Sequence, residues 1–251
     1  MKPTKKIVAI GGGEIRTAGT LDIDKEIIRL SGKKNPKFLF IPTASSDSEK
    51  YWEHIDNYYG KKLGCKTDVL YLIKEHPAHA EIQQKILNAD IIYVGGGNTL
   101  KMMRLWRRLG VDKLLKTAWQ KGIVLCGISA GSICWFESGH SDSMSFYNPK
   151  KWDYVNVKSL GFLKGIHCPH YNSATLGIPR KSHFQKMIQK IGGTGIAVDN
   201  NCAIEFIDDN YRVITSKPNA KAYKVFKKGA KVISESIAQA KELNPISNLF
   251  K

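Results

Sequence analysis

Short runs of apolar residues alternate with longer segments in which apolar positions recur every three or four residues, throughout the first half of the chain. Such short runs have the length of buried strands, whereas the longer segments have the periodicity of helices with one buried face. We therefore expect strands at residues 6–10, 38–41, 69–72, 91–94 and 123–126, and helices at about residues 21–30, 48–62, 78–87 and 100–119. Because crossover helices usually join parallel strands, this pattern predicts a doubly wound, mostly parallel α/β sheet.

The second half of the chain is less regular. Short strands are expected near residues 197–198, 203–207, 212–215 and 222–226, as antiparallel strands at the edge of the same sheet or in an extension of it. A length of 251 residues allows one large domain or two small ones. Since the chain has no linker rich in proline, glycine or serine and no internal repeat, we expect a single domain over residues 1–251.

Small and polar residues cluster directly after several predicted strands, at residues 11–13, 43–47, 95–99 and 127–132. In open parallel sheets, ligands and catalytic groups collect in the crevice at the carboxyl ends of the strands. We therefore expect the functional site at this edge of the sheet.

Basic residues outnumber acidic residues by 39 to 22, which gives a formal net charge of +17 and favours acidic partners. Two basic groups could bind nucleic acid, but no nucleic-acid-binding motif accompanies them, so we interpret both as solvated faces and expect no specific nucleic acid partner. The first group contains Lys101, Arg104, Arg107 and Arg108, and the second contains Lys217, Lys221, Lys224, Lys227, Lys228 and Lys231.

The five cysteines are widely spaced, odd in number and without a C-x-x-C pair, which favours a reducing compartment. The apolar run at residues 7–10 is too short for a signal peptide, and no run of about 18 apolar residues predicts a membrane span. We expect a cytoplasmic protein without a membrane partner, as a monomer or a homodimer.

The most informative motif is G-x-S-x-G at residues 127–131. It follows a predicted strand and precedes a predicted helical turn, which is the context of a nucleophile elbow. Glycines on either side of Ser129 let the chain turn sharply, and the backbone N–H of Ala130 points toward a developing oxyanion. The alternative is a turn that merely links a strand to a helix.

An elbow serine needs a base at neutral pH. We interpret four histidines on or beside predicted helices as surface residues, namely His54, His76, His79 and His183. Of the remaining His140, His167 and His170, the last follows the apolar segment 160–166 and a proline that fixes the chain locally. His170 is therefore the candidate base, and the alternative is a loop histidine with a structural hydrogen bond.

Three successive glycines at residues 95–97 follow another predicted strand. Their N–H groups could complete an oxyanion hole, although a tight turn or a phosphate cradle would also use them. Nucleotide binding is poorly supported, because neither glycine run satisfies G-x-G-x-x-G and no G-K-[ST] follows. A zinc site at His167, Cys168 and His170 lacks a convincing fourth ligand, so we expect no metal.

Over most of its length the chain resembles the peptidase E family of aspartyl dipeptidases, which also contains cyanophycinases. The resemblance is carried by Gly-Gly-Gly at residues 11–13, Phe-Ile-Pro-Thr-Ala at 40–44, Val-Gly-Gly-Gly-Asn-Thr at 94–99, Gly-Ile-Ser-Ala-Gly at 127–131 and Pro-His-Tyr at 169–171. It implies a fold like that of class I glutamine amidotransferases, with serine in place of cysteine at the elbow. It also implies hydrolysis of dipeptides with an N-terminal aspartate, without a metal or organic cofactor.

By residue match, the resemblance implies that Ser129 is the nucleophile, His170 the general base, and the N–H groups of Gly96 and Ala130 the oxyanion hole. Asp142 matches an acidic residue associated with catalysis in the family and is the expected third member of the triad. A second acidic position of the family falls on Asn200, which could accept a hydrogen bond from a histidine but brings no charge. We hold Asn200 and its neighbour Asp199 in reserve for this role.

Asn98 and Arg180 are the expected substrate-binding residues, and the expected partner is a small acidic peptide. Arg180 matches a basic position of the family and can hold a carboxylate bidentately, although an exposed surface arginine is the alternative. Two other functions stay open. One is β-aspartyl peptide hydrolysis of the cyanophycinase type, and the other is a non-catalytic homologue that binds small acidic ligands, which Asn200 favours.

Overall fold

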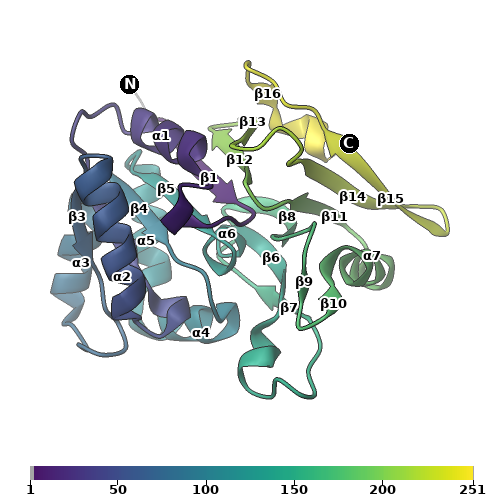
Figure 1. Ribbon diagram of the computed structural model, residues 1–251, viewed down its shortest axis with the longest axis horizontal. Coiled ribbons are helices and arrows are strands. Elements are labelled where there is room, and N and C mark those ends of the chain that lie inside the picture. Colours follow the sequence, from purple (N-terminus) through teal and green to yellow (C-terminus); the bar gives the residue numbers. More distant parts are fainter. Residues whose placement is uncertain (1–2, 251) are drawn as a thin grey trace.

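The computed structural model describes residues 3–250, which form two mixed sheets with helices packed against them (Figure 1). The larger sheet has the strand order β16-β13-β12-β1-β5-β4-β2-β3. Its strands are β1 Lys6–Ile10, β2 Lys37–Ile41, β3 Lys66–Val69, β4 Ile91–Val94, β5 Val124–Ile128, β12 Cys202–Ile207, β13 Asn210–Thr215 and β16 Asn244–Pro245. The strands from the first half pair in parallel and those from the second half pair antiparallel. The predicted α/β sheet is therefore confirmed for the larger sheet.

Helices cover both faces of this sheet because its strands bury alternate residues in opposite directions. Val8 of β1 packs on the side of α1 and α2, whereas Ile7 packs on the side of α3, α4 and α5. The helices are α1 Leu21–Leu30, α2 Glu49–Ile55, α3 His79–Asn88, α4 Thr99–Leu109 and α5 Val111–Gln120. This is the doubly wound arrangement that the alternation of strands and helices predicted.

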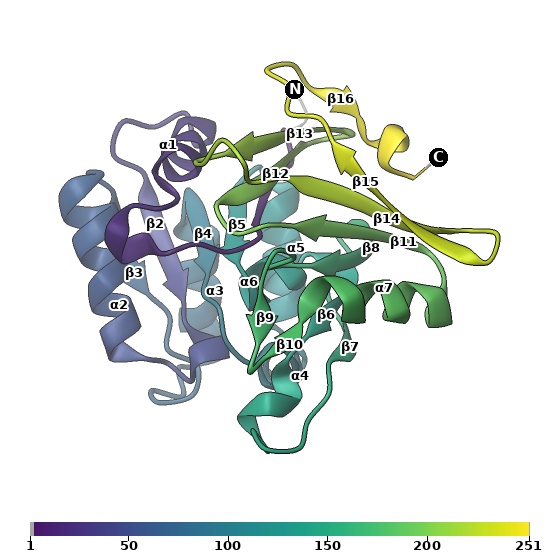
Figure 2. The same cartoon turned by 45° about the vertical axis from the view of Figure 1, so that its right-hand side comes forward.

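A second sheet, in the order β15-β14-β11-β8-β6-β7, carries most of the chain after residue 135 (Figure 2). Its strands are β6 Phe136–Ser141, β7 Val155–Lys158, β8 Leu163–Cys168, β11 Thr194–Val198, β14 Ala222–Lys228 and β15 Lys231–Ile237. The expectation of one continuous sheet was wrong here, because the chain leaves the larger sheet after β5 and the short helix α6 (Ala130–Ile133), and β6 pairs with β8 and β7 instead. Within the second sheet β6, β8 and β11 run parallel.

One apolar cluster joins the two sheets. It contains Ile7 and Leu125 of the larger sheet together with Phe136, Leu163 and Ile196 of the second. This shared core supports the proposal of a single domain. A small hairpin of β9 (Ala174–Thr175) and β10 (Ile178–Pro179) leads into helix α7 (Arg180–Ile191), which packs on the second sheet through Phe184 and Ile188.

Local sequence explains where the elements differ from the expected ranges. The segment 100–119 is two helices rather than one, because Gly110 adopts a left-handed conformation with a φ of 71° and ends α4. The expected helix at residues 48–62 begins at Glu49, after the N-cap Ser48, and α2 continues as a π-helical segment at Asp56–Lys62. The strand expected at residues 69–72 was placed wrongly, because β3 spans Lys66–Val69, an edge strand that tolerates alternating exposed residues.

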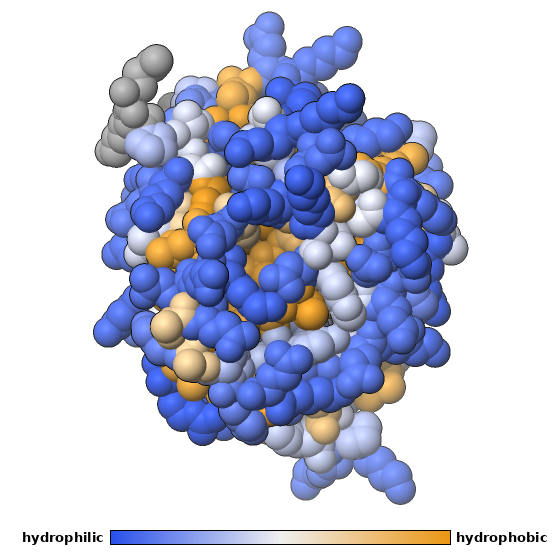
Figure 3. Space-filling view, turned by 90° about the vertical axis from the view of Figure 1, so that its left-hand side faces the viewer, coloured by the Kyte–Doolittle hydropathy of each residue, from blue (hydrophilic) through white to orange (hydrophobic). Residues whose placement is uncertain are grey.

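The face that carries α2, α3 and the edge strand β3 is largely hydrophilic, with apolar residues reaching the surface near its centre (Figure 3). Lys66 and Asp68 of β3 are exposed at this edge, and charged side chains on an edge strand oppose pairing with another chain. Within residues 3–250, no helix has the length and apolar character needed to cross a membrane.

Candidate active site

Ser129 lies at a sharp turn between β5 and α6. Its φ of 57° and ψ of −115° are strained for a residue with a side chain. The two flanking glycines permit this turn, because a Cβ on Gly131 would lie 2.0 Å from the carbonyl oxygen of Val94 and one on Gly127 would lie 2.3 Å from that of Gly131. The G-x-S-x-G motif therefore has the strand–turn–helix geometry of a nucleophile elbow.

Backbone amides surround the elbow. The N–H of Ala130 donates to no other group within the part of the chain that the structure describes. Gly96 packs directly against the serine, since a Cβ there would lie 3.3 Å from the Cβ of Ser129. Gly97, rather than Gly96, lines the pocket that contains Ser129. Both glycines thus lie beside the elbow, as expected for the loop after β4.

His170 reaches the same pocket from the end of β8. Its Nδ1 lies 2.6 Å from Oδ1 of Asn200, which follows the neighbouring parallel strand β11. A carbonyl oxygen only accepts hydrogen bonds, so Nδ1 carries the proton and Nε2 is left as the basic nitrogen. Asn200 is held in this orientation by its own donation from Nδ2 to Oγ of Ser173 at 2.7 Å.

The environment of His170 favours the neutral imidazole. Burial lowers its pKa to about 4, and the positive charge of Arg180 acts in the same direction, against weaker effects of Asn200 and Asp142. Gly12 closes this side of the site, because a Cβ there would lie 2.0 Å from Oδ1 of Asn200 and 2.3 Å from Nδ1 of His170. The histidine is therefore a base that stays unprotonated at neutral pH.

Ser129 and His170 line one pocket of about 270 Å³, although no hydrogen bond joins their side chains among residues 3–250. The other lining residues come from the elbow side, from the loop after β6 and from the hairpin before α7: Gly97, Asp142, Phe146, Ser173, Ala174, Thr175 and Arg180. Hydrogen bonds between catalytic groups are often long before substrate binds. The shared pocket shows that one bound molecule could contact both Ser129 and His170.

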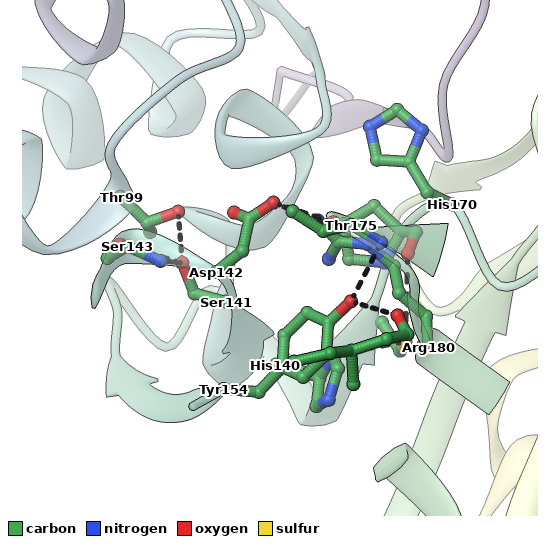
Figure 4. Close-up of polar contacts among 12 residues, drawn as sticks. Thr99, His140, Ser141, Asp142, Ser143, Tyr154, His170, Thr175 and Arg180 are labelled. Atoms are coloured by element: carbon green, nitrogen blue, oxygen red, sulfur yellow. Dashed lines mark hydrogen bonds and ion pairs between the residues drawn. The ribbon is translucent and has the colours of Figure 1, made fainter. Parts of the chain in front are cut away.

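Asp142 and Arg180 form an ion pair on the wall of this pocket, where Thr175 joins them (Figure 4). The hydroxyl of Thr175 donates to Asp142 at 3.0 Å and accepts from Arg180 at 3.0 Å. The side chain of Arg180 is only 4% exposed, so it requires a counter-charge at this position. Arg180 is thus a buried residue of the site and not an exposed surface cation.

The hydrogen-bond partner of His170 is Asn200 and not Asp142, the expected third residue of the triad. His170 contacts Asn200 and lies apart from Asp142, whose carboxylate is taken by Arg180 and Thr175 (Figure 4). Asp199 points elsewhere and accepts from the backbone N–H of Lys221 at 3.1 Å. Of the three candidates, the one without a charge is the histidine's partner.

The expected substrate contact of Asn98 is also not found. Asn98 is buried, with 5% of the residue exposed, and it does not line the pocket that contains Ser129. Its Oδ1 accepts from the N–H of Lys101 at 3.0 Å and caps α4, as a residue at a helix N-terminus commonly does.

The two other histidines left open by the sequence are buried behind the site. His167 contacts Oγ of Ser132 at 2.8 Å and the carbonyl of Ile196 at 2.9 Å. His140 stacks on Tyr154 with ring centroids 4.1 Å apart, as Figure 4 shows. Burial lowers the pKa of His167 to about 3 and that of His140 to about 2. Neither lines the pocket.

Sequence reasoning missed the hairpin that supplies Ser173 and Thr175, and the tyrosine that holds it. The hydroxyl of Tyr154 donates to the carbonyl of Ile178 at 2.9 Å and accepts from the N–H of Thr175 at 3.2 Å. The polar and aromatic composition of residues 138–158 was the only available signal. This composition does not indicate that Tyr154 holds the hairpin or that the hairpin lines the pocket.

Comparison with known proteins places this geometry in a family. The model of peptidase family S51 matches residues 7–214. The uncharacterized peptidase YgaJ of Bacillus subtilis (strain 168) is 37% identical over 223 residues, which cover 88% of this chain and 92% of that protein. Peptidase E of Shewanella denitrificans is 27% identical over 149 residues, or 59% of this chain and 60% of its own.

The fold is also that of a known peptidase structure. A crystal structure of a peptidase from an acI-B1 Actinobacterium aligns with a TM-score of 0.73 at 21% identity, covering 98% of this chain and 97% of that one. The family match and these relatives confirm the resemblance to the peptidase E family. Since the family match extends from β1 to β13, the chain belongs to peptidase family S51.

Proposed function

We propose that this peptidase is a serine-type dipeptidase that hydrolyses dipeptides with an N-terminal aspartate. The observation that carries the proposal is one pocket that joins the elbow serine, a neutral histidine and the ion pair of Asp142 with Arg180. The order of strand, elbow and helix also supports the implied likeness to class I glutamine amidotransferases.

In the proposed mechanism, Nε2 of His170 takes the proton of Ser129 as the hydroxyl oxygen attacks the peptide carbonyl. The N–H of Ala130, with the amides of the loop at residues 96–97, stabilises the resulting oxyanion. His170 then gives its proton to the leaving amine, which departs and leaves an acyl-enzyme. Water, deprotonated by the same nitrogen, attacks the ester, and the proton returns to the serine as the acid product leaves.

Asn200 takes the place of the usual acid in this proposal. Through its Oδ1 it fixes the ring and its tautomer, which the 2.6 Å contact with Nδ1 supports. It brings no negative charge to stabilise the imidazolium, so the base is oriented but not strengthened. We therefore replace Asp142 by Asn200 as the third residue of the catalytic group.

The ion pair of Asp142 and Arg180 fits both charges of an N-terminal aspartyl residue. Such a residue carries an ammonium group on its Cα and a side-chain carboxylate whose carbon is two bonds from the same Cα. Asp142, with a side chain 20% exposed, would bind the ammonium group, and Arg180 with Thr175 would bind the carboxylate. We propose that this wall selects the substrate and limits the enzyme to free N-termini.

The five cysteines are buried and unpaired among the residues described. Free thiols that are not held in disulfides are typical of a reducing compartment. They support the proposed cytoplasmic location.

The test compares α-Asp-Leu, β-Asp-Leu and Leu-Leu as substrates of the wild-type chain and of Ser129→Ala. Hydrolysis of α-Asp-Leu that is lost in Ser129→Ala, with Leu-Leu untouched, is the expected result. Faster release of leucine from β-Asp-Leu would instead establish the β-aspartyl activity. Binding of aspartyl peptides without hydrolysis of either would establish the non-catalytic homologue, and Ser129→Ala would then bind as wild type does.

A further inference from the structure

The proposed nucleophile and base are held by different sheets. Ser129 follows β5 of the larger sheet and His170 follows β8 of the second sheet, so their separation depends on contacts that cross between the sheets. At the end of β1, the N–H of Ser129 donates to the carbonyl oxygen of Ile10 at 3.2 Å. The N–H of His170 donates to the carbonyl oxygen of the next residue, Gly11, at 2.9 Å. These bonds join the two main chains on the β1 side of the site.

A second connection between the sheets is made by side chains, on the α6 side of the site. The hydroxyl of Ser132, in α6, donates to the carbonyl oxygen of Ser129 at 2.7 Å and lies 2.8 Å from Nε2 of His167. His167 lies in β8, three residues before His170. One hydroxyl thus contacts both the main chain of the nucleophile and the strand that carries the base.

His167 is itself held in one orientation. Its Nδ1 carries a proton, because it lies 2.9 Å from the carbonyl oxygen of Ile196, which only accepts. Its ring stacks on Phe136, with centroids 4.5 Å apart and the planes 6° from parallel. Burial lowers the pKa of His167 to about 3, so Nε2 is an acceptor and shares the single proton of the Ser132 hydroxyl with the carbonyl oxygen of Ser129.

The geometry of the elbow makes this connection relevant to the reaction. The strained conformation of Ser129 persists only where the surrounding contacts hold it. Because the peptide bond is planar and trans, the N–H of Ala130 points opposite to the carbonyl oxygen of Ser129. The hydroxyl of Ser132 holds that oxygen, and it therefore also fixes the direction of the N–H that faces the oxyanion in the proposed mechanism.

We propose that Ser132 and His167 are positioning residues for the reaction. They aim the N–H of Ala130 at the oxyanion, and they set the separation of the nucleophile and the base. The inference rests on the proposed function. Neither Ser132 nor His167 lines the pocket that contains Ser129, so losing their contact should leave substrate binding at the wall unchanged. It should slow the chemical step, since a misplacement of about 1 Å can cost about 100-fold in rate.

The kinetic test measures Asp-Leu hydrolysis by Ser132→Ala. We expect kcat to fall about 10- to 100-fold and KM to stay within about twofold of wild type. Ser159→Ala is the matched control, because it also removes a buried hydroxyl, one that donates to the carbonyl oxygen of Val157 at 3.2 Å outside the pocket. A wild-type kcat in Ser132→Ala, or an equal loss in Ser159→Ala, would overturn the proposal.

A second variant tests whether the two residues act together. His167→Phe keeps a ring that can stack on Phe136 but removes both nitrogens. If the residues act through one connection, the double variant Ser132→Ala/His167→Phe should lose no more kcat than the more damaged single variant. Losses that multiply would overturn the proposal. If His167→Phe does not fold, as judged by circular dichroism, Ser132→Ala decides alone.

A labelling measurement separates this inference from loss of fold and from the proposed function. Diisopropyl fluorophosphate is uncharged and phosphorylates a reactive serine with release of fluoride, so it needs no contact with Asp142 or Arg180. In Ser132→Ala the rate constant of labelling should fall about tenfold or more, with the final yield still one label per chain. A lower yield at an unchanged rate constant would indicate a misfolded fraction and overturn the proposal.

The same measurement judges the two proposals separately. Wild type that labels at Ser129 but does not hydrolyse Asp-Leu would refute the proposed substrate, and slower labelling of Ser132→Ala would then still support the positioning role. Wild type that neither labels nor hydrolyses Asp-Leu would overturn both proposals.

Discussion

Replacing Asn200 by aspartate tests how the catalytic histidine is tuned. The amide oxygen lies 2.6 Å from Nδ1 of His170, whose pKa burial lowers to about 4. A carboxylate at this distance favours the imidazolium and raises a histidine pKa by about one to three units. Ser173 can accommodate the change, because its hydroxyl can rotate from accepting the Asn200 amide to donating to a carboxylate.

The expected outcome is a shift of the acidic limb of kcat/KM from about pH 4 to between about pH 5 and 7. At pH 8 the base stays neutral in both forms, so the variant should gain rate there. Each unit of pKa corresponds to about 1.4 kcal/mol of stabilisation of the imidazolium that forms in the transition state, or about tenfold in rate where proton transfer limits it.

The assay is a pH–rate profile of Asp-Leu hydrolysis, with Asn57→Asp as the control. Asn57 is an exposed asparagine whose Oδ1 already accepts from Lys61 at 2.7 Å, so the control adds the same charge without approaching the site. An acidic limb that stays near pH 4 in Asn200→Asp would refute the reasoning, since the histidine would then not sense its partner's charge.

Three further predictions follow from the contacts. Asp142→Asn should raise the KM for aspartyl dipeptides about tenfold and leave the acidic limb of kcat/KM in place, whereas a triad acid would cost about 10⁴ in kcat. Gly12→Ala should abolish most activity without unfolding the chain, as judged by circular dichroism, because its Cβ would displace the contact between His170 and Asn200. The free energy of unfolding, measured in urea, should fall as the pH drops below about 6.5. Below that pH the histidines become protonated in the unfolded chain but stay neutral where they are buried in the folded chain. The histidines concerned are His140, His167 and His170. At pH 5 each should lower the free energy of unfolding by about 2 kcal/mol, and a profile that does not change with pH would contradict their lowered pKa values.

The elbow was predictable because its requirement is local. A strand followed by G-x-S-x-G leaves few conformations for the chain, and both glycines are needed for close contacts with the carbonyl oxygens of Val94 and Gly131. Most of the parallel sheet was predictable for a similar reason, since β1, β2, β4 and β5 consist mainly of consecutive apolar residues, whereas the edge strand β3 does not. The second sheet was not, because β6, β7 and β8 mix exposed and buried residues, so no continuous apolar run marks them as strands.

The partner of His170 depends on competition that no local pattern reveals. Asp142 follows β6 and Asn200 follows β11, and both strands lie beside β8. Either residue can therefore come near the histidine. Arg180 decides between them, because a guanidinium this deeply buried must be paired with the available carboxylate. Its effect on Asp142 depends on the hairpin before α7, and no pattern in residues 173–179 predicts where that hairpin lies.

This pairing also explains how the proposed substrate is chosen. An N-terminal aspartyl residue brings one positive and one negative group, so its binding leaves the net charge of the wall formed by Asp142 and Arg180 unchanged. The low pKa of His170, which depends in part on Arg180, is then preserved in the complex. A residue such as leucine brings only the ammonium group. It would compete with Arg180 for Asp142 and leave the buried guanidinium without its counter-charge, at a cost of several kcal/mol. Under the proposed function, selection in this pocket would therefore follow from charge balance rather than from shape alone.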